Sequence, residues 1–232
     1  MKNLIGRAAV WFKDGEYGRL SLNNRYYPLS VLYTRLLREA YQGKPLKFIN
    51  INFNSEKTYE LYPKALRHHL DFYNGHFNYR DVFDFDHFDS MGDYQKKVYI
   101  WSKVHEIVAA AAKKIGNAEL EKANEYAYTT GMERSLSADY KTLETEVVLF
   151  DQAVTAAIWY IFKDDGMYSY LALTRDKMEL FRKELARGAL GNEFFLVMYK
   201  RIIAKEDKII IEYVRMAETP PVRIPIERII PE

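Results

Sequence analysis

The chain has 232 residues, of which 48% are apolar or aromatic and 28% are charged, and its formal net charge is +2. This length and composition predict a globular protein with a sizeable core, and the near-neutral charge argues against wholesale attraction to nucleic acid or to an anionic membrane. The chain has no cysteine, which excludes disulfides and thiolate chemistry. The N-terminal residues lack the apolar block of a signal peptide, and no apolar run reaches the roughly 20 residues of a membrane span. We therefore expect a soluble, cytoplasmic protein.

The first third of the chain predicts two strand regions and two helices. An Asp14-Gly15 step between two apolar runs is a strong signal for a hairpin turn. Behind Pro28, apolar residues recur at helical spacing until Gly43. In the segment "LKFININFN", Phe48, Asn50 and Asn52 alternate with the apolar residues Ile49, Ile51 and Phe53. This alternation predicts a strand with one buried face. The expected elements are a hairpin over residues 7–22, a helix over 28–42, a strand over 46–54 and a short helix over 63–73.

The middle of the chain predicts three helices. Ser90 with Asp93 three residues later forms the acidic version of a capping box, and apolar residues then step by three or four as far as Gly116. Asn117 can cap the second helix. The third segment contains alanines that favour a helix, but its Val, Thr, Ile, Trp and Tyr content also suits a buried strand, so both assignments stay open. The expected helices cover residues 94–115, 118–134 and 139–162.

The last third predicts strands, one charged amphipathic helix and an extended tail. Four of the seven prolines lie in the final segment, where they deny backbone donors to a sheet. The expected elements are a strand over residues 167–173, a helix over 175–188, hairpin strands over 193–204 and 208–214, and a proline-rich extended tail over 216–232. The whole chain then reads as one α+β domain over residues 1–215, with an N-terminal β-hairpin, three central helices and C-terminal strands with a short amphipathic helix.

One segment concentrates negative charge. The stretch "YRDVFDFDHFDSMGDYQ", residues 79–95, contains five aspartates, and its last fifteen residues contain no lysine or arginine. Crowded carboxylates repel one another, and salt screens that repulsion only over about 8–10 Å. A partner rich in lysine and arginine would relieve the repulsion, and the interleaved aromatic rings are of a kind enriched at interfaces. The candidate partner-binding residues are Asp81, Asp84, Phe85, Asp86, Phe88, Asp89 and Asp93.

Metal binding and catalysis are the other uses considered for this segment. A calcium loop counted from Asp84 fails, because its later ligand and glycine positions hold Phe88, Asp89 and Gln95. A zinc site fails because His87 has no second histidine at helical spacing. The chain also has no nucleophile elbow, phosphate loop, dinucleotide fingerprint or zinc-protease motif. We therefore expect no catalytic residue, no metal and no cofactor; the alternative is a metal- or carboxylate-dependent hydrolase that uses the aspartates of residues 81–93.

A structural explanation of the acidic segment also stays open. Phe83 and Phe85 fall on one side of an extended chain, while Asp84 and Asp86 fall on the other. A half-buried edge segment with a solvated acidic face produces this pattern without any binding function. The outward charges would then serve to discourage edge-to-edge pairing with other chains.

The central helices resemble a known family. Residues 99–136, "YIWSKVHEIVAAAAKKIGNAELEKANEYAYTTGMERSL", are similar to helical pairs in immunity proteins of bacterial polymorphic toxin systems. The resemblance implies a cytosolic, non-enzymatic α+β protein that neutralises a cognate toxin by covering its active site, and the acidic segment suits a toxin with a basic cleft. We expect no membrane partner. We also expect no nucleic-acid partner, because acidic residues interrupt the basic ones in the C-terminal third. The oligomeric state stays open.

Overall fold

The computed structural model describes residues 4–149, 152–205, 208–215 and 220–225. The chain is a mixture of helices and strands, in agreement with the expected α+β class. It forms two compact units, Met1–Ala138 (unit 1) and Asp139–Glu232 (unit 2), whereas the sequence predicted one domain over residues 1–215. Among the described residues, no helix is both long and apolar enough to cross a membrane.

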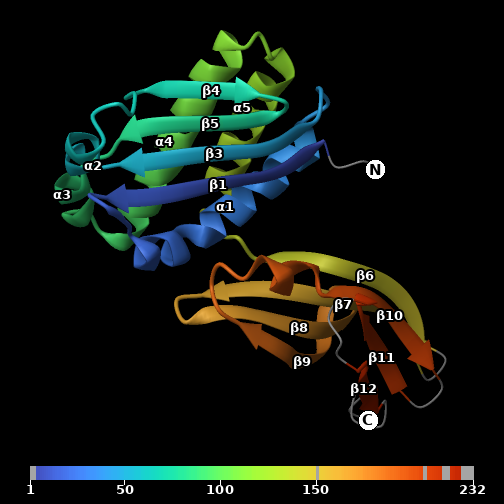
Figure 1. Ribbon diagram of the computed structural model, residues 1–232. Coiled ribbons are helices and arrows are strands. Elements are labelled where there is room, and N and C mark those ends of the chain that lie inside the picture. The colour runs from blue at the N-terminus through green and yellow to red at the C-terminus, as the bar shows by residue number, and fades with distance from the viewer. Residues whose placement is uncertain (1–3, 150–151, 206–207, 216–219, 226–232) are drawn as a thin grey trace. The chain divides into compact units, whose positions relative to one another are not determined.

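Unit 1 is a five-stranded sheet with its long helices on one face (Figure 1). The strand order is β2-β1-β3-β5-β4, in which β1, β3 and β5 are parallel and the outer strands run antiparallel to their neighbours. The strands are β1 (Ile5–Asp14), β2 (Tyr17–Gly18), β3 (Leu46–Asn54), β4 (His69–Tyr73) and β5 (His76–Val82). The helices are α1 (Leu20–Ala40), α2 (Glu56–Leu61), α3 (Phe85–Asp89), α4 (Asp93–Lys114) and α5 (Ala118–Glu133). In Figure 1, α1, α4 and α5 lie behind the sheet, and its front face carries no helix of unit 1.

Helix α1 covers the edge of β1 with a stripe of polar side chains. Beyond its short pairing with β2, this edge has no strand neighbour among the described residues, so its backbone groups need other partners. Three side chains of α1 accept hydrogen bonds from backbone N–H groups of β1, and an arginine of α1 donates a hydrogen bond to a carbonyl near the start of the strand. The bonds run from Phe12 N to Asn23 Oδ1 (2.8 Å), Val10 N to Ser30 Oγ (3.1 Å), Ala8 N to Thr34 Oγ1 (2.9 Å) and Arg38 Nε to Ile5 O (2.9 Å).

Asn124 of α5 joins the three long helices to one another. Its side chain is fully buried, accepts a hydrogen bond from the Tyr33 hydroxyl of α1 (2.5 Å) and donates one to the His105 carbonyl of α4 (2.9 Å). Burial raises the pKa of Tyr33 far above its usual range, so its hydroxyl stays protonated as the donor. Because a buried polar group costs stability unless it is bonded, these two bonds restrict how the helices can align.

Unit 2 consists of two antiparallel sheets, of order β6-β7-β8-β9 and β10-β11-β12. Hydroxyl groups link their elements: the Tyr160 hydroxyl donates to the Phe195 carbonyl (2.7 Å), and the hydroxyls of Ser169 and Tyr199 lie 2.6 Å apart. The first sheet contains β6 (Tyr140–Leu149), β7 (Gln152–Lys163), β8 (Gly166–Arg175) and β9 (Met178–Gly188). The remaining elements are a 3-10 turn (Glu193–Val197), β10 (Tyr199–Lys205), β11 (Lys208–Tyr213) and β12 (Val222–Pro225).

The C-terminal part differs most from the sequence-based expectation. The helix expected over 139–162 is absent, since its described residues form β6 and β7, and the amphipathic helix expected over 175–188 is the edge strand β9. In β7, Val154, Ala156, Ile158 and Tyr160 are buried at intervals of two, which is the period of a strand. Pairing with β8 therefore outweighs the helix preference of the alanines.

The N-terminal third and the tail also differ in detail. The hairpin expected over 7–22 shrinks to two residue pairs, and α1 begins eight residues before Pro28. The helix expected over 63–73 is absent: residues 63–68 form turns, residues 69–73 form β4, and the short helix α2 lies before them. Of the tail expected over 216–232, residues 222–225 form β12 against β11, and the tail residues other than 220–225 lie outside the described part of the chain.

Thr34→Val tests the contact between α1 and the edge of β1. The substitution keeps the shape of the side chain but leaves the buried Ala8 N–H without its acceptor, which costs about 1–3 kcal/mol of unfolding free energy. Faster hydrogen exchange at the Ala8 amide and a lower urea midpoint are expected. Thr129→Val, at an exposed position of α5, is the control and stays within about 0.5 kcal/mol. Equal stability of the two variants would contradict the assignment.

Candidate functional site

Phe85 and Phe88 of the acidic segment lie in the core of unit 1. The segment was expected to be extended, but it forms the short helix α3. Asp84 caps this helix, because its carboxylate accepts a hydrogen bond from the backbone N–H of His87 (2.9 Å). Both rings are buried and pack against Phe12 and Phe83. Neither ring is exposed as an anchor for a partner, and the alternation of phenylalanine with aspartate reflects a helix with one buried side.

Most of the aspartates of this segment are already engaged within unit 1. Asp81 is buried in β5, where its carboxylate lies 2.5 Å from Nδ1 of His68 and accepts the N–H of the next residue (3.0 Å). Asp86 is exposed on α3. The remaining two form ion pairs with arginines at the start of α1, namely Asp89 with Arg19 (3.5 Å) and Asp93 with Arg25 (2.8 Å). The expectation of carboxylates left uncompensated therefore fails for Asp81, Asp89 and Asp93.

The part of the chain that the structure describes has no group of three or more histidine, aspartate or glutamate side chains placed to hold a metal ion. The aspartates of residues 81–93 lie on β5, at the N-terminus of α3, within α3 and at the start of α4.

A different surface collects polar and aromatic side chains, on the face of the unit 1 sheet that the helices leave uncovered. Paired residues of neighbouring strands share a face, as do alternate residues along a strand. The register places Arg7, Phe48, His76 and Tyr73 in one row across four strands. We call this surface the platform; its side chains are Arg7, Trp11, Lys13, Phe48, Asn50, Asn52, His69, Asp71, Tyr73, His76, Asn78 and Arg80.

Three aromatic rings of the platform are open to solvent: Trp11 is 40% exposed, Phe48 37% and Tyr73 75%. The guanidinium carbon of Arg7 lies 5.6 Å from the ring centroid of Trp11 and 5.8 Å from that of Phe48, so one cation sits beside both rings. The Phe48 ring also contacts His76, with centroids 5.1 Å apart. These cation–π contacts hold the rings in defined positions while leaving much of their surface exposed.

Asparagine amides lie between the rings of the platform. Asn52 donates to the Asn78 side chain (2.8 Å) and to the Tyr79 carbonyl (3.1 Å), and the Trp11 indole N–H donates to Asn50 (3.4 Å). Both donor hydrogens of Asn52 are therefore bonded within the sheet, and its side-chain oxygen is an acceptor that these bonds do not use.

The charge of the platform is positive. Arg7, Lys13 and Arg80 are cations, and Asp71 is its one carboxylate. That carboxylate is bonded within the platform, to Arg80 (2.9 Å) and to His69 (3.0 Å). With neutral histidines the formal balance is three positive charges against one negative charge, and the negative charge is paired with one of the cations, Arg80.

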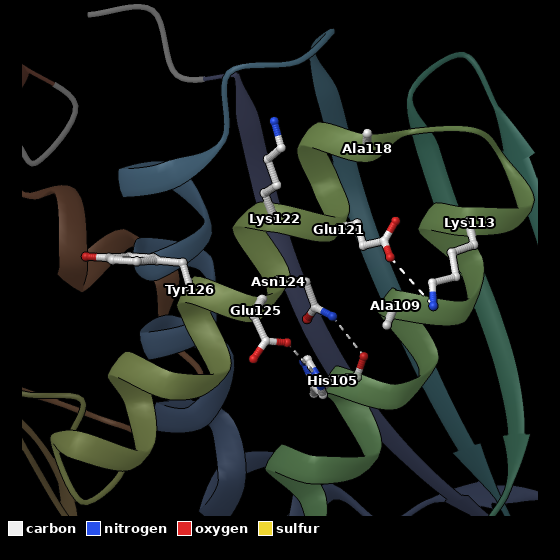
Figure 2. A pocket seen from close by; sticks show the side chains of 9 residues that line it. All are labelled: His105, Ala109, Lys113, Ala118, Glu121, Lys122, Asn124, Glu125 and Tyr126. Carbon is white, nitrogen blue, oxygen red and sulfur yellow. Dashed lines mark hydrogen bonds and ion pairs between the residues drawn. The ribbon is translucent and has the colours of Figure 1, made fainter.

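A hollow of about 670 Å³ lies on the other side of unit 1, between α4 and α5 (Figure 2). Figure 2 shows that its charged groups already pair across it: Lys113 lies 3.6 Å from Glu121, and His105 Nε2 lies 3.5 Å from Glu125. His105 also stacks on Tyr128 with ring centroids 4.4 Å apart. His105 therefore lies in the seam between α4 and α5.

The platform was not predicted from the sequence, although one signal for it is present. The alternation in residues 46–54 predicted a strand with one buried face, and that face is buried as expected. The outward residues Phe48, Asn50 and Asn52 were not recognised as part of a site. An aromatic ring followed by asparagines at intervals of two is unusual for a face that only meets water, and "HFNYR" places His76, Asn78 and Arg80 at the same intervals on β5.

Comparison with known proteins does not place the chain in a family. No family model matches it, and neither the curated proteins nor the solved structures contain a match. The similarity of residues 99–136 to immunity proteins therefore stays a prediction.

Substitution of Asp81 separates a structural role from a partner-binding role. Asp81→Ala removes a buried carboxylate that accepts the Val82 N–H and contacts Nδ1 of His68, so the free energy of unfolding is expected to fall by about 1–3 kcal/mol. The matched control is Asp86→Ala, an exposed aspartate of the same segment, which is expected to change it by less than about 0.5 kcal/mol. Urea denaturation measures both. An Asp81→Ala variant as stable as the control would show that this carboxylate is free for another role.

Proposed function

We propose that this chain is a non-enzymatic binding protein that recognises its partner through the platform. The observation that carries the proposal is the set of three exposed rings on a sheet face that the helices leave uncovered, two of them beside the guanidinium of Arg7. Trp, Tyr and Arg are the residue types that dominate binding energy at interfaces. Exposing such rings to water lowers solubility without stabilising the fold, so their grouping on one face indicates a binding surface.

The platform is also suited to binding because it is rigid. Its side chains stand on four hydrogen-bonded strands, and their contacts with one another hold them before any partner arrives. A surface that is already ordered loses little conformational entropy on association. Binding without a large rearrangement is the behaviour expected of a stoichiometric partner.

Inhibition of a toxin is the form of this function that the resemblance favours. The residues of the resemblance form α4 and α5, a packed helical pair behind the sheet. An inhibitor that uses the platform would cover an acidic or neutral cleft, because the platform carries more positive than negative charge. This revises the earlier expectation of a toxin with a basic cleft, in which Asp84, Asp86 and their neighbours would supply the contact.

Affinity capture from the native host tests the platform as the binding surface. A Trp11→Ala/Tyr73→Ala double variant removes two exposed rings, and we expect it to lose the partner that the parent chain retains. Tyr94→Ala is the control, since Tyr94 is 52% exposed but lies on α4. Quantitative mass spectrometry of the captured material measures the loss. A partner retained equally by the parent and the double variant would exclude the platform.

A further inference from the structure

We infer that the outer edge of β4 pairs with an extended strand of the partner protein, which then continues the unit 1 sheet. This inference rests on the proposed function, because it names how the partner of the platform is held. Unpaired backbone groups along a sheet edge are a template for another strand, and recognition by strand addition uses them. β4 is the last strand of the order β2-β1-β3-β5-β4 (Figure 1), and in the described part of the chain it pairs only with β5.

The hairpin of β4 and β5 determines which backbone groups of β4 face outward. The first pair of its ladder, Tyr73 with His76, closes a turn whose two residues have φ angles of 50° and 77°. The residues that close such a turn are hydrogen-bonded to each other, and along the ladder bonded pairs alternate with unbonded pairs. The N–H and C=O groups of Leu70 and Phe72 therefore point away from β5 and offer an incoming strand two donors and two acceptors.

The edge of β4 lacks the features that protect the other sheet edges. Side chains of α1 bond the edge of β1, whereas no described side chain bonds the backbone of β4. In unit 2, the outer strands β6, β9 and β10 have irregular registers with their neighbours, and β12 ends in a proline. β4 contains neither lysine nor proline, and its register with β5 is regular over all five pairs. Its edge is thus open to pairing.

Exposed rings flank this edge on both faces of the sheet. Tyr73 is 75% exposed and stands on the platform, whereas Phe72 is 44% exposed and lies on the opposite face, because side chains alternate along a strand. A strand added beside β4 would place its own side chains next to both rings. Apolar residues opposite Leu70 and Phe72 would remove apolar surface from water. The partner segment is therefore expected to be extended and apolar at alternate positions.

A second copy of β4 fits this edge less well than a different strand does. Two antiparallel copies that exchange bonds between Leu70 and Phe72 place Asp71 directly opposite Asp71 of the second copy. Like charges directly opposite each other destabilise a strand pair. The registers that pair Leu70 or Phe72 with its own copy bring in His68 or Asn74, whose φ angles of 49° and 50° are not those of a strand. The partner strand is thus a different sequence, without an acidic residue opposite Asp71.

Selection from a phage library of random dodecapeptides tests the inference with a defined probe. Phe72→Pro removes the ring and the outward N–H, whereas its matched control Phe72→Ala removes the ring alone. Proline is tolerated in an edge strand where the N–H faces solvent, so both variants are expected to fold. Fluorescence anisotropy is expected to show that Phe72→Pro binds the selected peptides about 3- to 10-fold more weakly than Phe72→Ala does.

Amide hydrogen exchange of the parent chain gives a readout that needs no variant. In the free chain, the amides of Leu70 and Phe72 are expected to exchange faster than those of Asp71 and Tyr73, whose N–H groups face β5. A saturating peptide is expected to slow exchange at Leu70 and Phe72 by about 10-fold or more. Contact through side chains alone would leave these two amides unprotected.

The outcomes separate this inference from the proposed function. Equal peptide binding by the two Phe72 variants, no protection of Leu70 and Phe72, or a library that yields no binding peptide would overturn pairing at the edge. A parent dimer that Phe72→Pro dissociates in analytical ultracentrifugation would assign the edge to a second copy and would also overturn it. If the edge fails but the Trp11→Ala/Tyr73→Ala variant still loses a protein in the capture experiment, the proposed function stands. If peptides protect the edge but capture is insensitive to the rings, the platform fails as the binding surface.

Discussion

The fit of α1 along the edge of β1 is the contact on which the arrangement of unit 1 depends. The side chains of Asn23, Ser30, Thr34 and Arg38 satisfy backbone groups that a sixth strand would otherwise pair. The helix is therefore bound to one edge and one face, and Asn124 then joins α4 and α5 to that same face. The opposite face receives none of the long helices of unit 1, which leaves β1, β3, β4 and β5 to present their outward side chains as the platform.

Four of the five aspartates of residues 79–95 have physical explanations inside the fold. One caps α3, one is buried beside His68, and two pair with arginines at the beginning of α1, whereas Asp86 is exposed. Exposed ion pairs of this kind add little stability, of the order of 0–1 kcal/mol each, but they lower the repulsion between neighbouring carboxylates. A dense run of one charge in the sequence thus need not be a binding surface, because its partners come from Arg19 and Arg25, more than sixty residues earlier.

The sequence predicted correctly those helices and strands that have a long, regular pattern of apolar residues. It missed segments whose secondary structure depends on pairing with other strands of the sheet. The strand over residues 46–54 agrees with β3, and the helices expected over 94–115 and 118–134 agree with α4 and α5 within a residue or two. Asn117 caps α5 as predicted, whereas α4 is capped by Gly92 and Gln95 instead of Ser90. Residues 175–188 form a charged helical pattern that becomes β9 because β8 pairs with it, and no local pattern predicts that pairing. The platform was missed for the same reason, since its rows exist only once four strands are in register.

The most direct measurement of the central claim uses the three tryptophan indole N–H signals as reporters. Trp11 stands on the platform, Trp101 is buried between helices with its N–H bonded to the Tyr128 carbonyl (3.1 Å), and Trp159 belongs to unit 2. In a proton–nitrogen correlation spectrum, a saturating ligand is predicted to shift the Trp11 indole signal and to leave those of Trp101 and Trp159 in place. A ligand that binds but moves only the Trp159 signal, or none of the three, would contradict recognition through the platform.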